Sequence, residues 1–300
     1  MTAHRSPPPE RRLLGIALYL GACVMFTGID ASAKWLGLVG LSAIQIVFVR
    51  YAGQLLLVSA MGFPRHGLGL VRTQNLKLQI FRASMLLIST VCNFIALQYV
   101  PLTVTGSIMF TMPLILCALS VPLLGEQVGW RRWTAIAIGF VGILIVVRPG
   151  SDAFHPAALL SFVSALSTAF YLLSTRRMAG QDSAETQQFY GAIFATVIFL
   201  PLALPVWVWP SEPTGWIAFV LIGTFGLVGH HLNTFAHNVA PASVIAPFSY
   251  FQIITMAAAS WVIFAEPPDV WLYVGAPIVI GSGLYIWMRE RELARTGDAS

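Results

Sequence analysis

The segment GHHLNTFAHN, Gly229 to Asn238, places three histidines and two asparagines within ten residues of an otherwise apolar stretch. Side chains of these types can hold a metal ion, take part in catalysis or line a polar path inside a membrane protein. On a helix His230 and His237 are two turns apart, about 10 Å, which is too far for one ion. The rest of the sequence has no nucleophile–base motif, no P-loop lysine and no metal-type cysteine spacing. We therefore expect no metal, no cofactor and no catalytic residue.

The composition indicates which class of protein surrounds these residues. Of 300 residues, 57% are hydrophobic and 10% are charged, and the mean hydropathy is +0.77. Soluble domains carry about 25% charged residues, because their surface must meet water. The surface of this chain must instead face lipid.

Ten runs are long and apolar enough to cross about 30 Å of hydrocarbon. The sequence therefore predicts an all-α integral membrane protein with ten transmembrane helices. The runs cover residues 13–36, 42–61, 78–99, 102–124, 133–147, 157–175, 186–208, 215–238, 242–265 and 270–288.

The basic residues predict the orientation of these spans. With both ends of the chain in the cytoplasm, thirteen of the 17 Lys and Arg residues fall on the cytoplasmic side and only Lys34 and Arg148 fall outside. This is the positive-inside pattern of a multi-pass protein of the cytoplasmic membrane. It also accounts for the net charge of +5 without a nucleic-acid partner.

The sequence matches itself when it is shifted by 140 residues. No gap is needed between residues 93 and 126 of the first copy. The matched positions are Asn93 with Asn233, Ala96 with Ala236, Pro101 with Pro241, Val104 with Val244, Ala118 with Ala258, Ser120 with Ser260 and Glu126 with Glu266.

The match predicts two five-helix repeats, at residues 13–149 and 150–289, between cytoplasmic tails at 1–12 and 290–300. Because five is odd, the second repeat must enter the membrane from the opposite side. Inverted repeats of this kind build secondary transporters, whose substrate binds near the bilayer midplane between the halves.

Residues 81–149 resemble the repeat of the drug/metabolite transporter superfamily, EamA branch. The features that carry this resemblance are Phe48–Arg50, Arg82, Ala83, Pro113, Gly125, Glu126, Arg132, Trp133, Gly142 and Pro149. The second half matches through Pro241, Ser243, Trp261 and Glu266, and departs at Ile253, where the family pattern would repeat the proline of position 113. The resemblance implies a transporter of small metabolites, most plausibly an amino-acid exporter of the YddG type.

Polar side chains on the span faces are the candidates for substrate contact. A polar residue that faces lipid is costly, so these residues should face protein or a water-filled cavity. Polar packing between helices is the alternative for the histidines, and snorkelling to lipid phosphate is the alternative for Arg82. The substrate-binding candidates are Asn93, Asn233, His230, Arg82, Ser89, Ser107, Thr111, Tyr171, Tyr250 and Gln252.

Three further features have predicted structural roles. Asp30 and Lys34 are spaced i, i+4 and could form a gate or a simple ion pair. Arg50 has no acidic residue at i±4, and we expect it to cap a neighbouring helix end. Gly139 with Gly142, and Gly281 with Gly283, indicate close helix packing or a homodimer interface.

The sequence thus favours a secondary transporter that exports amino acids by alternating access at a central cavity. Its partners would be a small-molecule substrate and the lipid bilayer. An intramembrane enzyme or lipid-modifying protein that uses His230, His231 and His237 remains the alternative.

The predicted orientation can be tested with topology reporters. Reporters fused at Gly69 and after Ser300 should read cytoplasmic, and a reporter at Glu212 should read outside. The reason is the asymmetry of the basic residues together with an even number of spans. A periplasmic reading after Ser300 would contradict the ten-span inverted arrangement.

Overall fold

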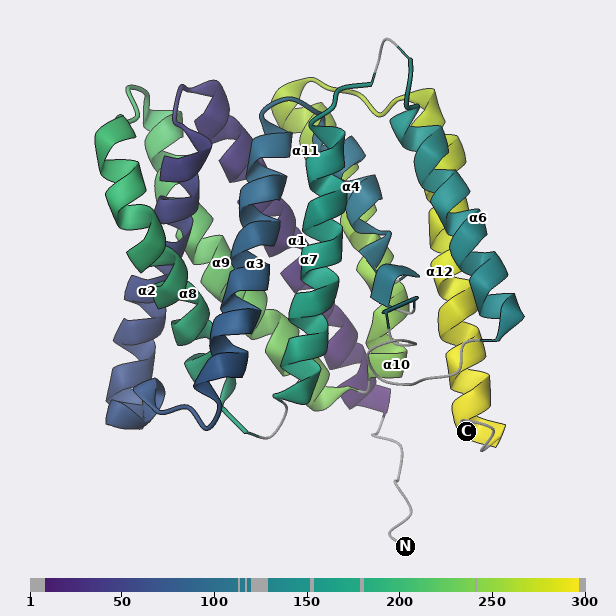
Figure 1. Cartoon of the computed structure of the whole chain (residues 1–300), viewed down its shortest axis with the longest axis horizontal. Coiled ribbons are helices and arrows are strands. Elements are labelled where there is room, and N and C mark those ends of the chain that lie inside the picture. The colour runs from purple at the N-terminus through teal and green to yellow at the C-terminus, as the bar shows by residue number, and fades with distance from the viewer. Residues whose placement is uncertain are drawn as a thin grey trace, which may run out of the picture.

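The computed structural model describes residues 9–112, 114–116, 118–119, 129–151, 154–178, 181–240 and 242–296. Among these residues every regular element is a helix, and the helices lie side by side in one bundle (Figure 1). The α-helices are α1 (Pro9–Leu38), α2 (Ala43–His66), α3 (Leu76–Leu97), α4 (Leu102–Met109), α6 (Trp130–Val147), α7 (Ala158–Arg177), α8 (Ala184–Ala203), α9 (Pro213–Val239), α10 (Ala242–Ile245), α11 (Phe251–Phe264) and α12 (Val270–Thr296). Short 3-10 helices are η1 (Gly67–Val71), η2 (Leu204–Val206) and η3 (Ala246–Tyr250).

The structure confirms an all-helical membrane fold. Eight helical segments of the described chain are long and apolar enough to span a membrane. Two shorter apolar helices, Leu102–Leu116 and Trp133–Val147, coincide with the predicted fourth and fifth spans. Pro113, Gly125, Glu126 and Pro241, which carry part of the family resemblance, lie outside the described residues.

Short polar side chains fix where several helices begin. The hydroxyl of Ser42 accepts a hydrogen bond from the backbone N–H of Gln45 at the start of α2, and Asn75 and Ser183 cap α3 and α8 in the same way. These caps satisfy backbone donors that a helix cannot satisfy itself. Inside the apolar runs, helical hydrogen bonds satisfy the backbone groups, which is why runs of this kind can cross lipid.

The two ends of the bundle can be assigned to the two sides of the membrane. The start of α1 and the end of α12 lie at the lower end of Figure 1, together with the connections from α2 to α3 and from α7 to α8. These segments carry the arginines that predict the cytoplasmic side. We therefore call this the cytoplasmic end and the opposite end, which holds the α11–α12 connection, the outer end.

The packing of the helices follows the order of the repeat. In the repeat, α1 of the first half corresponds to α7 of the second, and α3 corresponds to α9. The structure packs α1 along α9 and, equivalently, α7 along α3. α2 with α8, α4 with α11, and α6 with α12 each pair a helix with its own counterpart. Exchanging the two halves leaves this set of pairs unchanged, as a two-fold relation between them requires. The exact ends of the halves and tails stay predictions.

Glycines allow backbones of the two halves to approach closely at two crossings. A Cβ added to Gly223 on α9 would lie 3.0 Å from the Cα of Gly53 on α2. A Cβ added to Gly142 on α6 would lie 3.0 Å from the carbonyl oxygen of Gly275 on α12. The expected packing role of Gly281 is wrong, because a Cβ there would meet nothing within 4 Å.

The α2–α9 crossing can be tested with a matched pair of variants. Gly223→Ala should lower the free energy of unfolding by about 1–3 kcal/mol, because the added methyl overpacks a backbone contact. Gly281→Ala should leave it unchanged or slightly raise it, since alanine has the higher helix propensity and the site is open. Thermal melting of the detergent-purified protein measures both. Equal melting temperatures for the two variants would contradict this description of the crossing.

Candidate functional site

The outer end of the bundle is held by an ion pair between a buried lysine and a partly exposed glutamate. The Nζ atom of Lys34 on α1 lies 2.7 Å from Oε1 and 2.6 Å from Oε2 of Glu266, which follows α11. The side chain of Lys34 is only 6% exposed, and that of Glu266 is 35% exposed. Lys34 also approaches the carbonyl oxygen of Val100 at 3.5 Å. The pair therefore ties the first half of the chain to the second.

The backbone around Glu266 holds its carboxylate in place. Ala265 adopts a left-handed conformation, φ 54°, which ends α11 and turns the chain. The N–H of Glu266 then donates to the carbonyl oxygen of Ser260, and the Ser260 hydroxyl donates to Oε2 of Glu266. The predicted Asp30–Lys34 pair is wrong, because Lys34 turns to a partner 232 residues away.

Asp30 binds an amide on the third span. The Nδ2 atom of Asn93 on α3 donates to Oδ1 of Asp30 at 2.9 Å. Asn93 was a candidate for substrate contact, and the structure places it inside the bundle beside a carboxylate. The Oδ1 atom of Asn93 is buried and has no hydrogen-bond partner.

Arg50 joins the same polar region from α2. Its Nη1 atom donates to the hydroxyl of Thr90 at 2.5 Å and approaches the hydroxyl of Tyr51 at 3.4 Å. Its guanidinium lies over the rings of Tyr51 and Phe94, 4.8 and 5.5 Å from their centroids. The expectation that Arg50 caps a helix end is wrong, because Thr90 lies within α3 and binds it through its side chain.

The histidines of α9 turn towards α1 and towards their own helix. The ring of His230 meets the ring of Phe26 edge-on at 5.3 Å, and that of His237 meets Tyr19 at 5.9 Å. His231 lies next to the carbonyl oxygen of Leu227 on its own helix. In the described part of the chain no three His, Cys, Asp or Glu side chains form a group that could hold a metal ion.

Further candidates gather between α3 and α7. The hydroxyl of Ser89 lies 2.9 Å from that of Ser164 and 2.7 Å from that of Thr168. About two helical turns closer to the cytoplasm on α3, the guanidinium of Arg82 lies over the ring of Tyr171, 5.1 Å from its centroid. Ser89, Arg82 and Tyr171 therefore share one interface. Arg82 is buried here and does not extend to the lipid phosphates.

Arg82 also belongs to a cytoplasmic network around Asp182. It donates to the carbonyl oxygen of Gln187 and to the side chain of Gln79, which in turn donates to Asp182 at 2.8 Å. Burial alone would raise the pKa of Asp182, but hydrogen bonds from Thr73, the Gln74 N–H and Gln79, with the charge of Arg82, lower it overall. This network links the α7–α8 connection of the second half to the α2–α3 connection of the first. A pocket of about 340 Å³ opens beside it.

The regular α-helix of both the fourth and the ninth span is interrupted in the first half of the span. The helix α4 ends at Met109, and η3 separates α10 from α11 at Pro247. Phe110 and Tyr250 occupy equivalent positions of the repeat, and their rings lie 5.4 Å apart. Equivalent residues meet in this way only close to the axis that relates the two halves.

The candidates on these two spans differ in their environment. The hydroxyls of Ser107 and Thr111 donate to carbonyl oxygens of their own segment and are buried. Tyr250 packs against Gly283 on α12, and a Cβ there would clash with its hydroxyl. Gln252 and Asn233 are half-buried. The predicted substrate contact of Asn233 and Gln252 stays a prediction.

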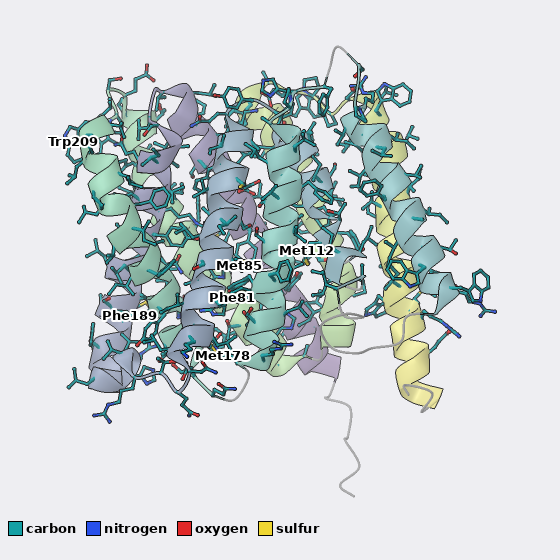
Figure 2. The ribbon with its side chains drawn as sticks, in the orientation of Figure 1. Phe81, Met85, Met112, Met178, Phe189 and Trp209 are labelled. Carbon is teal, nitrogen blue, oxygen red and sulfur yellow. The ribbon has the colours of Figure 1, made fainter. Side chains whose placement is uncertain are left out.

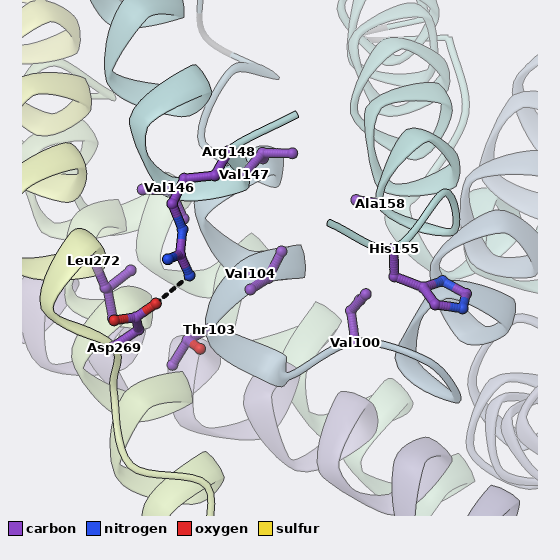
Figure 3. Close-up of a pocket in the computed structure, with 10 residues that line it drawn as sticks. All are labelled: Val100, Thr103, Val104, Val146, Val147, Arg148, His155, Ala158, Asp269 and Leu272. Atoms are coloured by element: carbon purple, nitrogen blue, oxygen red, sulfur yellow. Dashed lines mark hydrogen bonds and ion pairs between the residues drawn. The ribbon is translucent and has the colours of Figure 1, made fainter. Parts of the chain in front are cut away.

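A second pair of charges joins the halves at the outer end. Arg148, which ends α6, binds Asp269 before α12, and both line a small pocket of about 60 Å³ (Figure 3).

Near this end Trp209 stacks on Trp216 and projects at the edge of the bundle (Figure 2). An exposed aromatic at this depth suits the membrane interface.

The fold and the paired charges define a class of protein: a multi-span membrane protein of two repeats with polar residues buried between them. The EamA-like transporter family model matches residues 13–148 and again residues 155–288. The chain therefore belongs to the EamA-like transporter family, as the resemblance implied. It is a multi-pass protein of the cytoplasmic membrane.

Relatives of known activity are transporters. The chain is similar to an S-adenosylmethionine uptake transporter of Rickettsia felis, with 28% identity over 93% of this chain and 94% of the relative. It is also 28% identical to a riboflavin transporter of Vibrio cholerae, over 94% of this chain and 96% of the relative. A pseudopaline exporter, CntI, of Pseudomonas aeruginosa is 26% identical over 89% and 93% of the two chains. One solved crystal structure shares the fold, with a TM-score of 0.62 at 18% identity, over 92% of this chain and 98% of that one.

Sequence reasoning missed the partner of Lys34 and the polar role of Arg50. A usable signal was present: a charge inside a span must have a partner, and Glu266 ends the ninth span on the side where Lys34 ends the first. Because Arg50 has no acidic residue at i±4, the sequence was interpreted as giving it a backbone partner at a helix end. The hydroxyl of Thr90 on the next span was an equally good acceptor.

The Lys34–Glu266 pair predicts unequal effects of removing each partner. Glu266→Ala should lower the free energy of unfolding by about 3–5 kcal/mol, because it leaves a buried ammonium unpaired. Lys34→Ala should lower it less, since the Glu266 carboxylate is partly exposed and can be hydrated. The exchanged pair Lys34→Glu with Glu266→Lys should recover part of the loss. Thermal unfolding of the purified variants measures these effects.

A surface pair supplies the control. Arg289→Ala breaks an exposed pair with Glu292 on α12 and should change stability by less than about 1 kcal/mol. The description of the buried pair would be wrong if Glu266→Ala were as mild as this control.

Proposed function

We propose that the chain is a secondary transporter that moves small polar metabolites, amino acids among them, by alternating access between its two halves. One observation carries the proposal: the partly buried Lys34–Glu266 pair joins the halves at the outer end of a bundle whose interior holds Asp30 and Arg50. Charges inside a membrane bundle mark substrate or ion pathways.

Contacts between the halves exist at both ends and differ in kind. The outer end has two ion pairs, Lys34–Glu266 and Arg148–Asp269. The cytoplasmic end has the neutral and charged hydrogen bonds around Asp182. Breaking one set while keeping the other would open the interior to one side at a time, which is the requirement of alternating access.

The relatives bear on the substrate class. Their names cover S-adenosylmethionine, riboflavin and pseudopaline, all polar solutes with several hydrogen-bonding groups. Amino acids, the substrates inferred from the sequence, are likewise polar solutes with several hydrogen-bonding groups. Both uptake and export occur among these names, so the direction of transport is a separate part of the proposal.

The intramembrane-enzyme alternative is the less favoured one. It needs the three histidines of α9 to act on a bound substrate. Two of them instead pack on aromatic rings of α1, and the third lies beside a carbonyl oxygen of its own helix. The relatives are named as transporters. We propose transport without chemical change, driven by gradients or by exchange.

Counterflow into proteoliposomes tests this function. Purified protein would be reconstituted with unlabelled solute inside, and labelled L-methionine, S-adenosylmethionine or riboflavin would be added outside. We expect saturable uptake of at least one solute, stimulated by the same solute inside and absent from protein-free liposomes. No stimulated uptake of any of the three by folded protein would contradict the proposal. Chromatography of the recovered solute would expose an enzyme, because a chemically altered product would appear.

A further inference from the structure

We propose that Asp30 and Arg50 bind the two charged ends of an α-amino-acid group in the substrate, the carboxylate on Arg50 and the ammonium on Asp30. This inference rests on the transport function proposed above and names the substrate class of its interior site. Neither residue was expected from the sequence to touch a substrate.

The first argument is that two opposite charges lie inside the bundle without pairing with each other. Asp30 on α1 is held by the amide of Asn93, and Arg50 on α2 by the hydroxyls of Thr90 and Tyr51. The ion pairs of the described residues join Lys34 to Glu266, Arg148 to Asp269 and Arg289 to Glu292. Their partners on α3, Asn93 and Thr90, are three residues apart, so Asp30 and Arg50 reach neighbouring positions on one helix. A solute with one charge of each sign would complement both.

The second argument is that the same region has polar atoms without partners. The Nε atom of Arg50, the Oε1 atom of Gln54 and the Oδ1 atom of Asn93 are each buried and form no hydrogen bond. Arg50 and Gln54 are themselves more than nine-tenths buried. Buried polar groups are almost always hydrogen-bonded, so three in one region indicate a missing partner.

The chemistry of these atoms matches the two ends of an amino acid. The Nε–H of Arg50 is a donor and suits a carboxylate. The Oδ1 atom of Asn93 is an acceptor and, with the carboxylate of Asp30 beside it, can receive N–H groups of an ammonium. A solute that lacks either charge would leave one of these two side chains without an ionic partner in the substrate.

Packing holds these side chains in position before a substrate arrives. The guanidinium of Arg50 is fixed over the rings of Tyr51 and Phe94. Gln54 lies one turn further along α2 and faces Gly226 on α9, where a Cβ would be 3.4 Å from its Oε1 atom. Such preorganisation reduces the entropy lost on binding.

Analogues that each lack one charge test the proposal on the unaltered protein. L-methionine, 3-(methylthio)propylamine without the carboxylate, and 4-(methylthio)butanoate without the ammonium would compete against counterflow of labelled L-methionine or S-adenosylmethionine. We expect each truncated analogue to compete about tenfold more weakly, or worse, than L-methionine, because a charged hydrogen bond is lost.

Variants then assign each end of the solute to its residue. In Arg50→Gln the analogue without a carboxylate should no longer be at a disadvantage to L-methionine, whereas the analogue without an ammonium should remain so. In Asp30→Asn the analogue without an ammonium should no longer be at a disadvantage to L-methionine, whereas the analogue without a carboxylate should remain so. Arg289→Gln, on the exposed cytoplasmic end of α12, should keep both disadvantages. Gel filtration checks that each variant is folded. If Arg50→Gln is not folded, Arg50→Lys replaces it, and loss of the guanidinium fork should then reduce, but not abolish, the disadvantage of the analogue without a carboxylate.

Each remaining outcome overturns the inference in a distinguishable way. Riboflavin exchange without exchange of either amino-acid solute would leave the transporter intact and reject the zwitterion site. Equal analogue penalties in the wild type and both variants would show that Asp30 and Arg50 serve the fold alone. No exchange of any solute would reject the transport function and this inference with it.

Discussion

A charged side chain inside a lipid-facing bundle has few ways to be stabilised, and this constraint shapes the whole structure. Neither water nor counterions reach it freely, so a partner must come from another helix. Lys34 finds Glu266 across the two halves, and Arg50 finds Thr90 and two aromatic rings. Each such partnership fixes the distance between two helices. The polar residues thus determine which helices meet, whereas the apolar residues determine only that they cross the membrane.

The two-fold relation between the halves is the second organising feature. Helices pair with their counterparts at α2–α8, α4–α11 and α6–α12, and the equivalent residues Phe110 and Tyr250 touch where the fourth and ninth spans break. The polar interior does not share this symmetry. Its charges, Asp30 and Arg50, both come from the first half, and the corresponding region of the second half offers His230 at the position equivalent to Thr90. The symmetric scaffold therefore carries an asymmetric set of charges, which matches the two different ends of the proposed solute.

The sequence was sufficient for the helices and insufficient for their partners. Apolar runs of the right length located the ten spans because lipid selects for length and composition locally. The i, i+4 spacing of Asp30 and Lys34 pointed to a pair that does not form, because a local rule cannot weigh a partner 232 residues away. Gly281 illustrates the same limit: a small residue shows where close packing is allowed, and only the structure shows that α12 turns this position outwards.

The central claim is that the halves move against each other around a fixed interior site, and pulsed electron spin resonance tests it most directly. One pair of spin labels would replace Leu38 and Val270, exposed residues of the two halves at the outer end, and a second pair would replace Leu68 and Met288 at the cytoplasmic end. Adding a transported solute or changing its gradient should lengthen one distance while shortening the other. Distances that stay constant, or that change in the same direction at both ends, would contradict the account.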